Sequence, residues 1–152
     1  MSRKYILVIN PGSTSTKVAI FEGENPVVIE KVEHGSEELK SFDSAIAQYD
    51  YRLKLIMEWL EKIKISTSEL LAVVGRGGLL QPIPGGTYAV SDLMKEDLKI
   101  GVQGEHPANL GGLLAAGIAK HENIPAYITD AVGTNEFEDI ARLSGVKELT
   151  KK

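Results

Sequence analysis

The sequence contains no cysteine, and this absence excludes several kinds of chemistry. The 152 residues can form no disulfide framework, thiolate nucleophile or cysteine-ligated zinc site. Three scattered histidines make no zinc motif on their own. A chain without disulfides fits a reducing compartment, and we expect a cytoplasmic location.

Long apolar runs and an excess of basic residues are also missing. The first apolar run extends only from Tyr5 to Ile9, too short for a secretion signal, and no run approaches the roughly 18 residues of a membrane span. A formal net charge of −4 argues against a broad surface for nucleic acid or an anionic membrane. We therefore expect no membrane and no nucleic-acid partner, and any anion site must be local.

The composition that remains is that of a globular domain. Hydrophobic residues make up 43% of the chain and charged residues 25%, and the length is that of one ordinary domain. The sequence shows no internal repeat, low-complexity segment or linker. We expect residues 1–152 to form a single domain.

Short β-branched and aromatic runs predict the strands. Residues 5–10, 16–21 and 27–32 are separated by glycine and proline, which predicts an antiparallel meander. The apolar run 70–74 ends in "GRGG" and suits a strand buried on both faces. Residues 125–130 are expected to form the last strand.

Helical periodicity appears between these strands. Apolar residues at steps of three and four over residues 43–62 predict a packing helix without chemistry of its own, capped by Ser41 or Asp43. A short helix is expected from residue 91, and another from about residue 108 to 121. In the latter, Gly111 and Gly112 each cost about 1 kcal/mol relative to alanine, which suggests that another backbone or a ligand comes close there.

Asn135 and Glu138 resemble a capping pair for a final helix, in which Phe137, Ile140 and Ala141 face inward and Gly145 marks the end. The resulting order βββ-α-β-α-α-β-α indicates an α/β domain. We expect a mixed sheet, with an antiparallel meander followed by parallel strands and flanking helices.

Four hydroxyl side chains follow Asn-Pro-Gly at the first predicted bend, in "NPGSTSTK" at residues 10–17. Hydroxyls and approachable backbone N–H groups at such a bend form a concave anion site, and Lys17 adds positive charge. The segment is no Walker loop, because no glycine stands directly before the lysine, no Ser or Thr directly follows it, and a strand rather than a helix comes next. A plain hairpin turn is the alternative, but the four hydroxyls favour phosphate.

Two further charged residues follow predicted strands. Arg76 lies between glycines, where a guanidinium can clamp a carboxylate or phosphate, although a surface arginine is about as common there. Asp130 ends the last strand, where it either serves function or caps a helix. If the strands ending at Asn10, Val74 and Asp130 run parallel, one cleft holds all three sites.

A histidine, His106, precedes the predicted helix that starts near residue 108. Free N–H groups at a helix start attract anions, so this histidine is a candidate for an anion site. A lone histidine at this position is more often a cap or a structural residue. His34 and His121 lie in polar surroundings and receive no role.

Several motifs resemble one known family over nearly the whole chain. They are "VINPGSTSTKVAIFE", "GRGGLLQPIPGGTYAV", "GEHPANLGG" and "YITDAV…EDIARLSG". In these motifs the chain resembles the N-terminal half of the butyrate kinases, in the acetokinase family of the sugar kinase, Hsp70 and actin superfamily. The resemblance implies an actin-like (ribonuclease H-like) fold and ATP- and Mg²⁺-dependent transfer between a short or branched fatty acid and its acyl phosphate.

The resemblance also implies roles for the matching positions. Arg76 and Asp130 become the catalytic residues, and Asn10 and Asp130 lie near the Mg²⁺ ion. Arg76, His106 and the glycines after the arginine are implied to bind the substrate acid or acyl phosphate. The residues implied for the phosphates of ATP or ADP are Gly12, Ser13, Thr14, Ser15 and Lys17, and those implied for substrate are Arg76, Gly77, Gly78 and His106.

Members of this family are about twice as long and carry a second, nucleotide-binding domain. We therefore expect that domain to be absent here, a C-terminal half chain as a possible partner, homo-oligomers as the usual assembly, and little activity from this chain alone. Two alternatives stay open. One is a noncatalytic phosphate-binding or assembly module derived from an acyl kinase, and the other is a phosphate-binding regulator.

Overall fold

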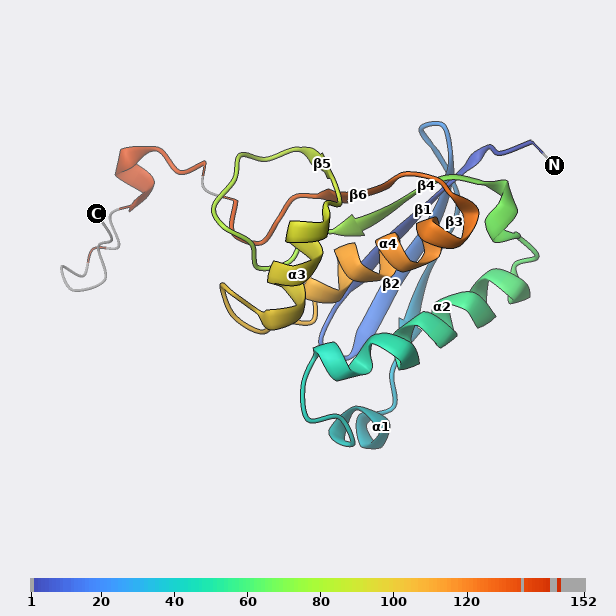
Figure 1. Ribbon diagram of the computed structural model, residues 1–152, viewed down its shortest axis with the longest axis horizontal. Helices are drawn as coiled ribbons and strands as arrows, with labels where there is room; N and C mark the ends of the chain where they lie inside the picture. The colour runs from blue at the N-terminus through green and yellow to red at the C-terminus, as the bar shows by residue number, and fades with distance from the viewer. Residues whose placement is uncertain (1, 135, 143–144, 146–152) are drawn as a thin grey trace.

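A six-stranded mixed sheet organises the chain, and helices α2 and α4 pack against one of its faces (Figure 1). The computed structural model describes residues 2–134, 136–142 and 145. The strand order is β3-β2-β1-β4-β6-β5. The strands are β1 (Tyr5–Pro11), β2 (Ser15–Glu22), β3 (Asn25–Glu33), β4 (Leu70–Arg76), β5 (Thr87–Ala89) and β6 (Ala126–Thr129).

The direction of the strands follows the expected plan. β1, β2 and β3 form an antiparallel meander, because short turns connect them. β4 pairs parallel with β1, and β6 pairs parallel with β4. The predicted mixed sheet is therefore confirmed. The short edge strand β5, which lies antiparallel to β6 within a segment expected to be a loop, was not predicted.

The helices supply the connections between parallel strands. They are α1 (Ser36–Lys40), α2 (Tyr49–Lys62), α3 (Asp92–Ile100) and α4 (Asn109–Glu122), with short 3-10 turns at Ile46–Gln48, Thr67–Glu69 and Asp139–Arg142. Ser91 caps α3 through a hydrogen bond that its side chain accepts from the Met94 amide, 3.1 Å away. No helix among the described residues has both the length and the apolar character needed to cross a bilayer.

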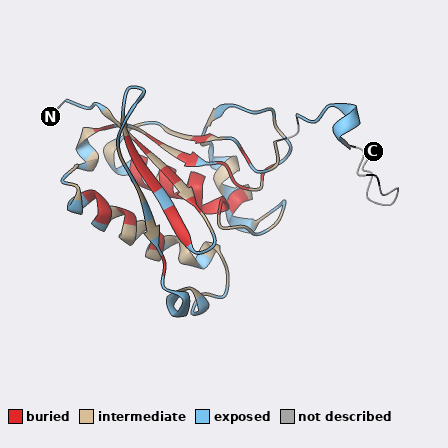
Figure 2. Cartoon of the chain, turned by 180° about the vertical axis from the view of Figure 1, so that it is seen from behind, coloured by how far each residue is buried: buried red, intermediate tan, exposed pale blue. Residues whose placement is uncertain are grey.

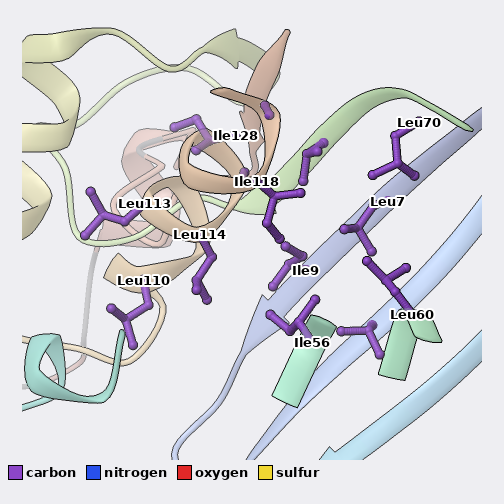
Figure 3. Close-up of a cluster of buried hydrophobic side chains, with 14 of the residues drawn as sticks. Leu7, Ile9, Ile56, Leu60, Leu70, Leu110, Leu113, Leu114, Ile118 and Ile128 are labelled. Atoms are coloured by element: carbon purple, nitrogen blue, oxygen red, sulfur yellow. The ribbon is translucent and has the colours of Figure 1, made fainter. Parts of the chain in front are cut away.

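The core lies between the sheet and the helices α2 and α4 (Figure 3). Leu7 and Ile9 of β1 point toward the helices and are fully buried. Ile56 of α2 and Leu114 of α4 meet them from the other side and are equally buried. Each such side chain contributes about 1.5–3 kcal/mol when removed from water, so this layer fixes how the helices lie on the sheet.

The opposite face of the sheet stays partly exposed, as the burial colours show in Figure 2. Ile29 of β3 is 65% exposed and Leu71 of β4 is 47% exposed. The prediction that β4 is buried on both faces was therefore wrong. In the described part of the chain, α2 and α4 pack on the face that carries Leu7 and Ile9, so the second face has no comparable cover.

The predicted helix over residues 43–62 begins later than expected. Residues 36–40 form the separate short helix α1, and α2 starts only at Tyr49, with no side-chain cap. The hydroxyl of Ser41 donates to the Glu38 carbonyl at 2.6 Å at the end of α1. Neither Ser41 nor Asp43 therefore caps α2. The apolar face was predicted correctly, because Ile56 and Leu60 are buried there.

The predicted final helix was also wrong in the part that the structure describes. Residues 139–142 form only a 3-10 turn. Phe137 is 64% exposed and Ile140 is 75% exposed, so neither faces inward. Asn135, the proposed cap, lies outside the described residues.

A close backbone contact joins β4 to α4 at two glycines. A Cβ atom on Gly75 would fall on the carbonyl group of Gly111, and one on Gly111 would fall on the carbonyl oxygen of Arg76. Backbones approach this closely only where side chains are absent. The expectation that another backbone comes near Gly111 is thus confirmed.

We predict that Gly75→Ala destabilises the domain by about 3 kcal/mol or more, because the added methyl group meets rigid backbone rather than a side chain that can move. Urea unfolding, followed through the buried Trp59, measures the change. Gly35→Ala is the matched control, since its Cβ would meet only the flexible side chain of Glu38. Equal effects of the two substitutions would contradict this account of the contact.

Candidate functional site

The carboxyl ends of the parallel strands meet at one edge of the sheet. Ile9 of β1 pairs with Gly75 of β4, so that the next residues along the two strands, Asn10 and Arg76, lie side by side. Arg76 in turn pairs with Thr129 of β6, directly before Asp130. Three predicted site residues from distant parts of the chain therefore share this edge, as parallel pairing requires.

Strand alternation decides which face these side chains occupy. Ile9, Val18 and Gly75 are level with one another and face the helices. Because successive residues of a strand point to opposite faces, Asn10, Lys17 and Arg76 form a row on the face that α2 and α4 leave open.

The bend between β1 and β2 presents free donors at the end of this row. The Gly12 amide donates to the Ser15 carbonyl at 2.7 Å, which closes the bend. Ser13 and Thr14 at its tip are exposed, and within the described residues neither their amides nor their hydroxyls make a hydrogen bond. A group of unpaired N–H and O–H donors at a tight bend is suited to an anion.

The cations of the row are unpaired as well. Lys17 and Arg76 are both exposed, and neither forms an ion pair with any carboxylate of the described residues. The Arg76 backbone is held between the β6 ladder and Gly111, and its side chain extends from there as an exposed group. Its guanidinium is therefore available to a ligand.

The backbone at Asp130 adopts an unusual conformation. Its φ of 49° lies in the left-handed region, and its amide donates to the Gly86 carbonyl at 3.3 Å. The other non-glycine residues with positive φ in the described chain, Lys64 and Asn123, follow the ends of helices. Asp130 has no such role, and residues held in this region away from helix ends are concentrated at functional sites.

The loop after Arg76 is packed tightly by its glycines. A Cβ on Gly77 would lie 2.6 Å from the Ala131 Cα, and one on Gly78 would lie 2.6 Å from the Asn109 Cα. Asn109 is 4% exposed, and its side-chain oxygen accepts a hydrogen bond from the Leu79 amide at 2.8 Å. These glycines therefore let α4 and the segment after β6 hold the loop.

The side chain of His106 acts as a local cap. Its Nδ1 accepts a hydrogen bond from the Ala108 amide at 3.1 Å, before the start of α4. It also lines a small cavity of about 120 Å³, with residues from the end of α3 and the segment before α2. Among the described residues, His106 makes no hydrogen bond to Arg76 or to the bend.

Behind the bend, α2 places a buried cation that sequence reasoning did not identify. Arg52 is fully buried, and its Nη2 donates to the Gly12 carbonyl at 2.8 Å. Its Nη1 donates to the Ser15 carbonyl at 3.3 Å and to the Thr16 hydroxyl at 3.0 Å. The bend is thus attached to a helix about forty residues later in the chain.

The Thr16 hydroxyl faces the buried Arg52 guanidinium and not the exposed side of the bend. It is 1% exposed and lies 2.9 Å from Nε2 of His34, so only three of the four hydroxyls in the motif remain for an anion. Burial, and then the charge of Arg52, lower the pKa of His34 from 6.5 to about 4. The imidazole is therefore neutral at pH 7, and its Nδ1 finds no hydrogen-bond partner in the described part of the chain.

The sequence does contain a signal for Arg52. It lies three residues after Tyr49 and four before Ile56, on the apolar face of α2, where a charged residue is unexpected unless it has a specific partner. His34 carries no such signal, because its neighbours in the sequence are polar and its burial arises only from folding.

Oxygen ligands for a cation are sparse in the described residues, which contain no group of three or more His, Asp or Glu side chains able to hold a metal ion. Mg²⁺ needs only one or two carboxylates when phosphate and water supply its other ligands. Asp130 and Asn10, oxygen donors at the same sheet edge, fit such an ion.

A groove of about 760 Å³ lies elsewhere, between α2 and α4 on the helix side of the sheet. It is lined by Tyr49, Leu53, Gly117 and Lys120, among others, and contains none of the predicted site residues. The strand-edge residues are favoured as the site because unpaired donors and cations converge there.

Comparison with known proteins relates the chain to one group of enzymes. It is 48% identical over 147 residues to a probable butyrate kinase of Clostridium botulinum (strain Eklund 17B / Type B) and 50% identical over 147 residues to probable butyrate kinase 2 of Caldanaerobacter subterraneus subsp. tengcongensis. Each match covers 97% of this chain but only 41% and 42% of the relative, so the chain spans about two fifths of their length. No protein-family model matches the chain.

Among solved structures, the Porphyromonas gingivalis acetate kinase is similar with a TM-score of 0.51 at 17% identity, covering 86% of this chain and 38% of that one. At this identity the likeness concerns the fold alone. The expected actin-like α/β fold is confirmed by it and by the mixed sheet.

The lowered pKa of His34 predicts a pH-dependent stability. Because the folded-state pKa is about 4 and the unfolded value 6.5, the unfolded chain takes up a proton first as the pH falls. Full stability is present above pH 6.5, and about 2 kcal/mol is lost between pH 7 and pH 5. Urea unfolding at both pH values should show this loss in the wild type and a smaller one in His34→Gln. His121→Gln, at an exposed position, is the control and should behave as wild type. An unchanged pH dependence in His34→Gln would contradict the assignment.

Proposed function

Because this chain is related to the butyrate kinases over 97% of its length, we propose that it is the N-terminal domain of an enzyme that transfers a phosphoryl group between ATP and butyrate or a similar short fatty acid. The observation that carries the proposal is the meeting of the Ser13 bend, Arg76 and Asp130 at the carboxyl edge of β1, β4 and β6.

The chemistry requires two anions to approach each other. A carboxylic acid with a pKa of about 4 to 5 is already ionised at neutral pH, so the acceptor needs no general base. The barrier is the repulsion between carboxylate and phosphate, and catalysis of phosphoryl transfer consists mainly of positioning and charge stabilisation. Lys17 and Arg76 are suited to this task because both lie on one face of the sheet and neither forms an ion pair with a described residue.

In this proposal the bend binds phosphate. Gly12, Ser13, Thr14 and Ser15 supply backbone and hydroxyl donors to the phosphates of ATP or ADP, and Lys17 supplies charge. Arg76 binds the carboxylate or the transferred phosphoryl group, since its guanidinium can make two parallel hydrogen bonds to either. Gly77, Gly78 and His106 complete the substrate side. The tight packing of the two glycines gives them the role of holding the Arg76 loop in position.

Asp130 and Asn10 would hold the Mg²⁺ ion that accompanies the nucleotide. When bound, such an ion neutralises phosphate charge. The left-handed backbone at Asp130 sets the direction in which its side chain leaves the strand end, and because the acceptor acid is already ionised its carboxylate is better suited to orienting the ion or its water than to removing a proton. We also propose a cytoplasmic location and self-association of the complete enzyme.

The chain supplies only one side of the cleft in this proposal. Kinases of this type enclose the nucleotide between two lobes and exclude water. The curated relatives are more than twice as long as the stretch that they share with this chain. We therefore expect little turnover from the chain alone, and a C-terminal part as its functional partner.

The direct test is reconstitution. The chain is mixed with the separately produced C-terminal part of the Clostridium botulinum relative, butyrate and Mg-ATP, and butyryl phosphate is trapped as the hydroxamate. Product that depends on both parts supports the proposal. If the intact relative is active and the mixture forms no product although the parts associate, the chain is a noncatalytic module.

We predict that Arg76→Ala lowers turnover of the reconstituted enzyme by about a thousandfold, because it removes the charge between the two anions. Arg76→Lys, which keeps the charge but not the paired donors, should recover only part of this loss. Arg3→Ala is the matched control, as Arg3 precedes the opposite end of β1 and its guanidinium donates to the Glu122 carbonyl, away from the strand-edge site. Activity of Arg76→Ala within a few-fold of wild type would remove Arg76 from the mechanism.

A further inference from the structure

Arg52 is the feature that the proposed function leaves unexplained. It is 0% exposed, in the middle of α2, between apolar residues that pack on the sheet. Burying a guanidinium costs several kcal/mol unless each donor finds a partner, and an apolar residue at such a position is often as stable or more so. Packing alone gives no reason for an arginine here.

Every donor of the guanidinium is satisfied by a neutral acceptor. An arginine has five N–H donors. In this chain they meet the Gly12 and Ser15 carbonyls, the Thr16 hydroxyl and, through Nε at 3.0 Å and Nη2 at 2.8 Å, the side-chain oxygen of Gln48. Within the described residues no carboxylate oxygen lies within 4.0 Å of it. The group is therefore fully hydrogen-bonded but its charge is not neutralised.

Among the described residues, the titratable side chain that shares the Thr16 hydroxyl with Arg52 is His34, and it adds no charge. The pKa of His34 is lowered to about 4 by burial and by Arg52, so the imidazole is neutral near pH 7. Tyr51, which packs against His34, has a raised pKa because of burial and stays neutral too. The Tyr51 hydroxyl donates to a carboxylate oxygen of the exposed Glu38 at 2.8 Å, but this carboxylate does not lie within 4.0 Å of the guanidinium. Among the described residues, Arg52 is therefore the charged side chain that contacts the bend from its buried side.

We propose that Arg52 is a positioning residue of the phosphate site: from behind the bend it holds the Gly12 and Ser15 carbonyls away from the ligand, and its unneutralised charge favours a polyanion on the exposed side. The inference rests on the proposed function, because it requires the bend to bind phosphate. A buried charge is screened less by salt than an exposed one. Arg52 can therefore attract an anion that is bound on the other side of the bend.

Gln48→Glu separates the two parts of this role. The substitution keeps the shape and the acceptor oxygen that Arg52 contacts twice, but it places a carboxylate against the guanidinium. A charge-assisted pair should leave the fold as stable as wild type or more stable. If Arg52 serves only the fold, phosphate binding is unchanged or improved. If its charge serves the ligand, binding weakens although the fold is intact.

The experiment measures binding of inorganic tripolyphosphate to the 152-residue chain by titration calorimetry, with urea unfolding of each variant alongside. We expect Gln48→Glu and Arg52→Gln to lower the affinity by about five- to thirtyfold, because each removes or neutralises one positive charge that attracts the polyanion across the bend. Lys54→Gln is the matched control, because it makes the same change of net charge on an exposed residue of α2 and should stay within about twofold of wild type.

The outcomes are distinguishable. Wild-type affinity in folded Gln48→Glu overturns the role of Arg52 and leaves the phosphate site intact. Absence of tripolyphosphate binding in the wild type overturns the phosphate site itself, and this inference with it. If Arg52→Gln fails to fold, Gln48→Glu still decides, because it keeps all five hydrogen bonds.

Discussion

The contact between Gly75 of β4 and Gly111 of α4 is the constraint on which the arrangement depends. It lets α4 lie directly against the central strand, and the start of α4 then packs on the loop that follows Arg76. Because Gly75 faces the helix, strand alternation turns the side chain of Arg76 to the opposite face. One close backbone approach on the helix side therefore determines which residues are presented on the other.

The same alternation divides the residues of the first bend between two tasks. Thr16 faces inward, where it contacts Arg52 and His34, whereas Lys17 faces the open side of the sheet next to Asn10. The bend thus lies between a buried cation and exposed ones. In a chain with a net charge of −4, this concentrates positive charge where the proposed chemistry brings two anions together.

Local patterns in the sequence were sufficient for the three strands of the meander, for β4 and β6 and for the glycine contact, but not for the short edge strand β5. The meander follows from short β-branched runs between turn residues, and two glycines within α4 indicated a close backbone neighbour. The final helix was wrong because an amphipathic pattern needs a surface on which to bury its apolar side, and Phe137 is exposed in the described structure.

The roles of the buried groups behind the bend could not be predicted from the sequence for a different reason. Arg52 broke the apolar face of a predicted packing helix, but nothing local indicated that the bend, about forty residues earlier, supplies its acceptors. Asn109 fixes the Arg76 loop through a contact that spans thirty residues. Such partners come from the tertiary fold, so sequence reasoning located the motifs of the site and missed what supports them.

If residues from three strand ends form one anion site, an NMR titration of the chain with tripolyphosphate should detect them as a unit. The amide signals of Ser13, Thr14, Arg76, Gly77 and Asp130 should then shift together and saturate at a common concentration. Shifts confined to the groove between α2 and α4, around Tyr49 and Lys120, with the strand-edge signals unchanged, would contradict this expectation.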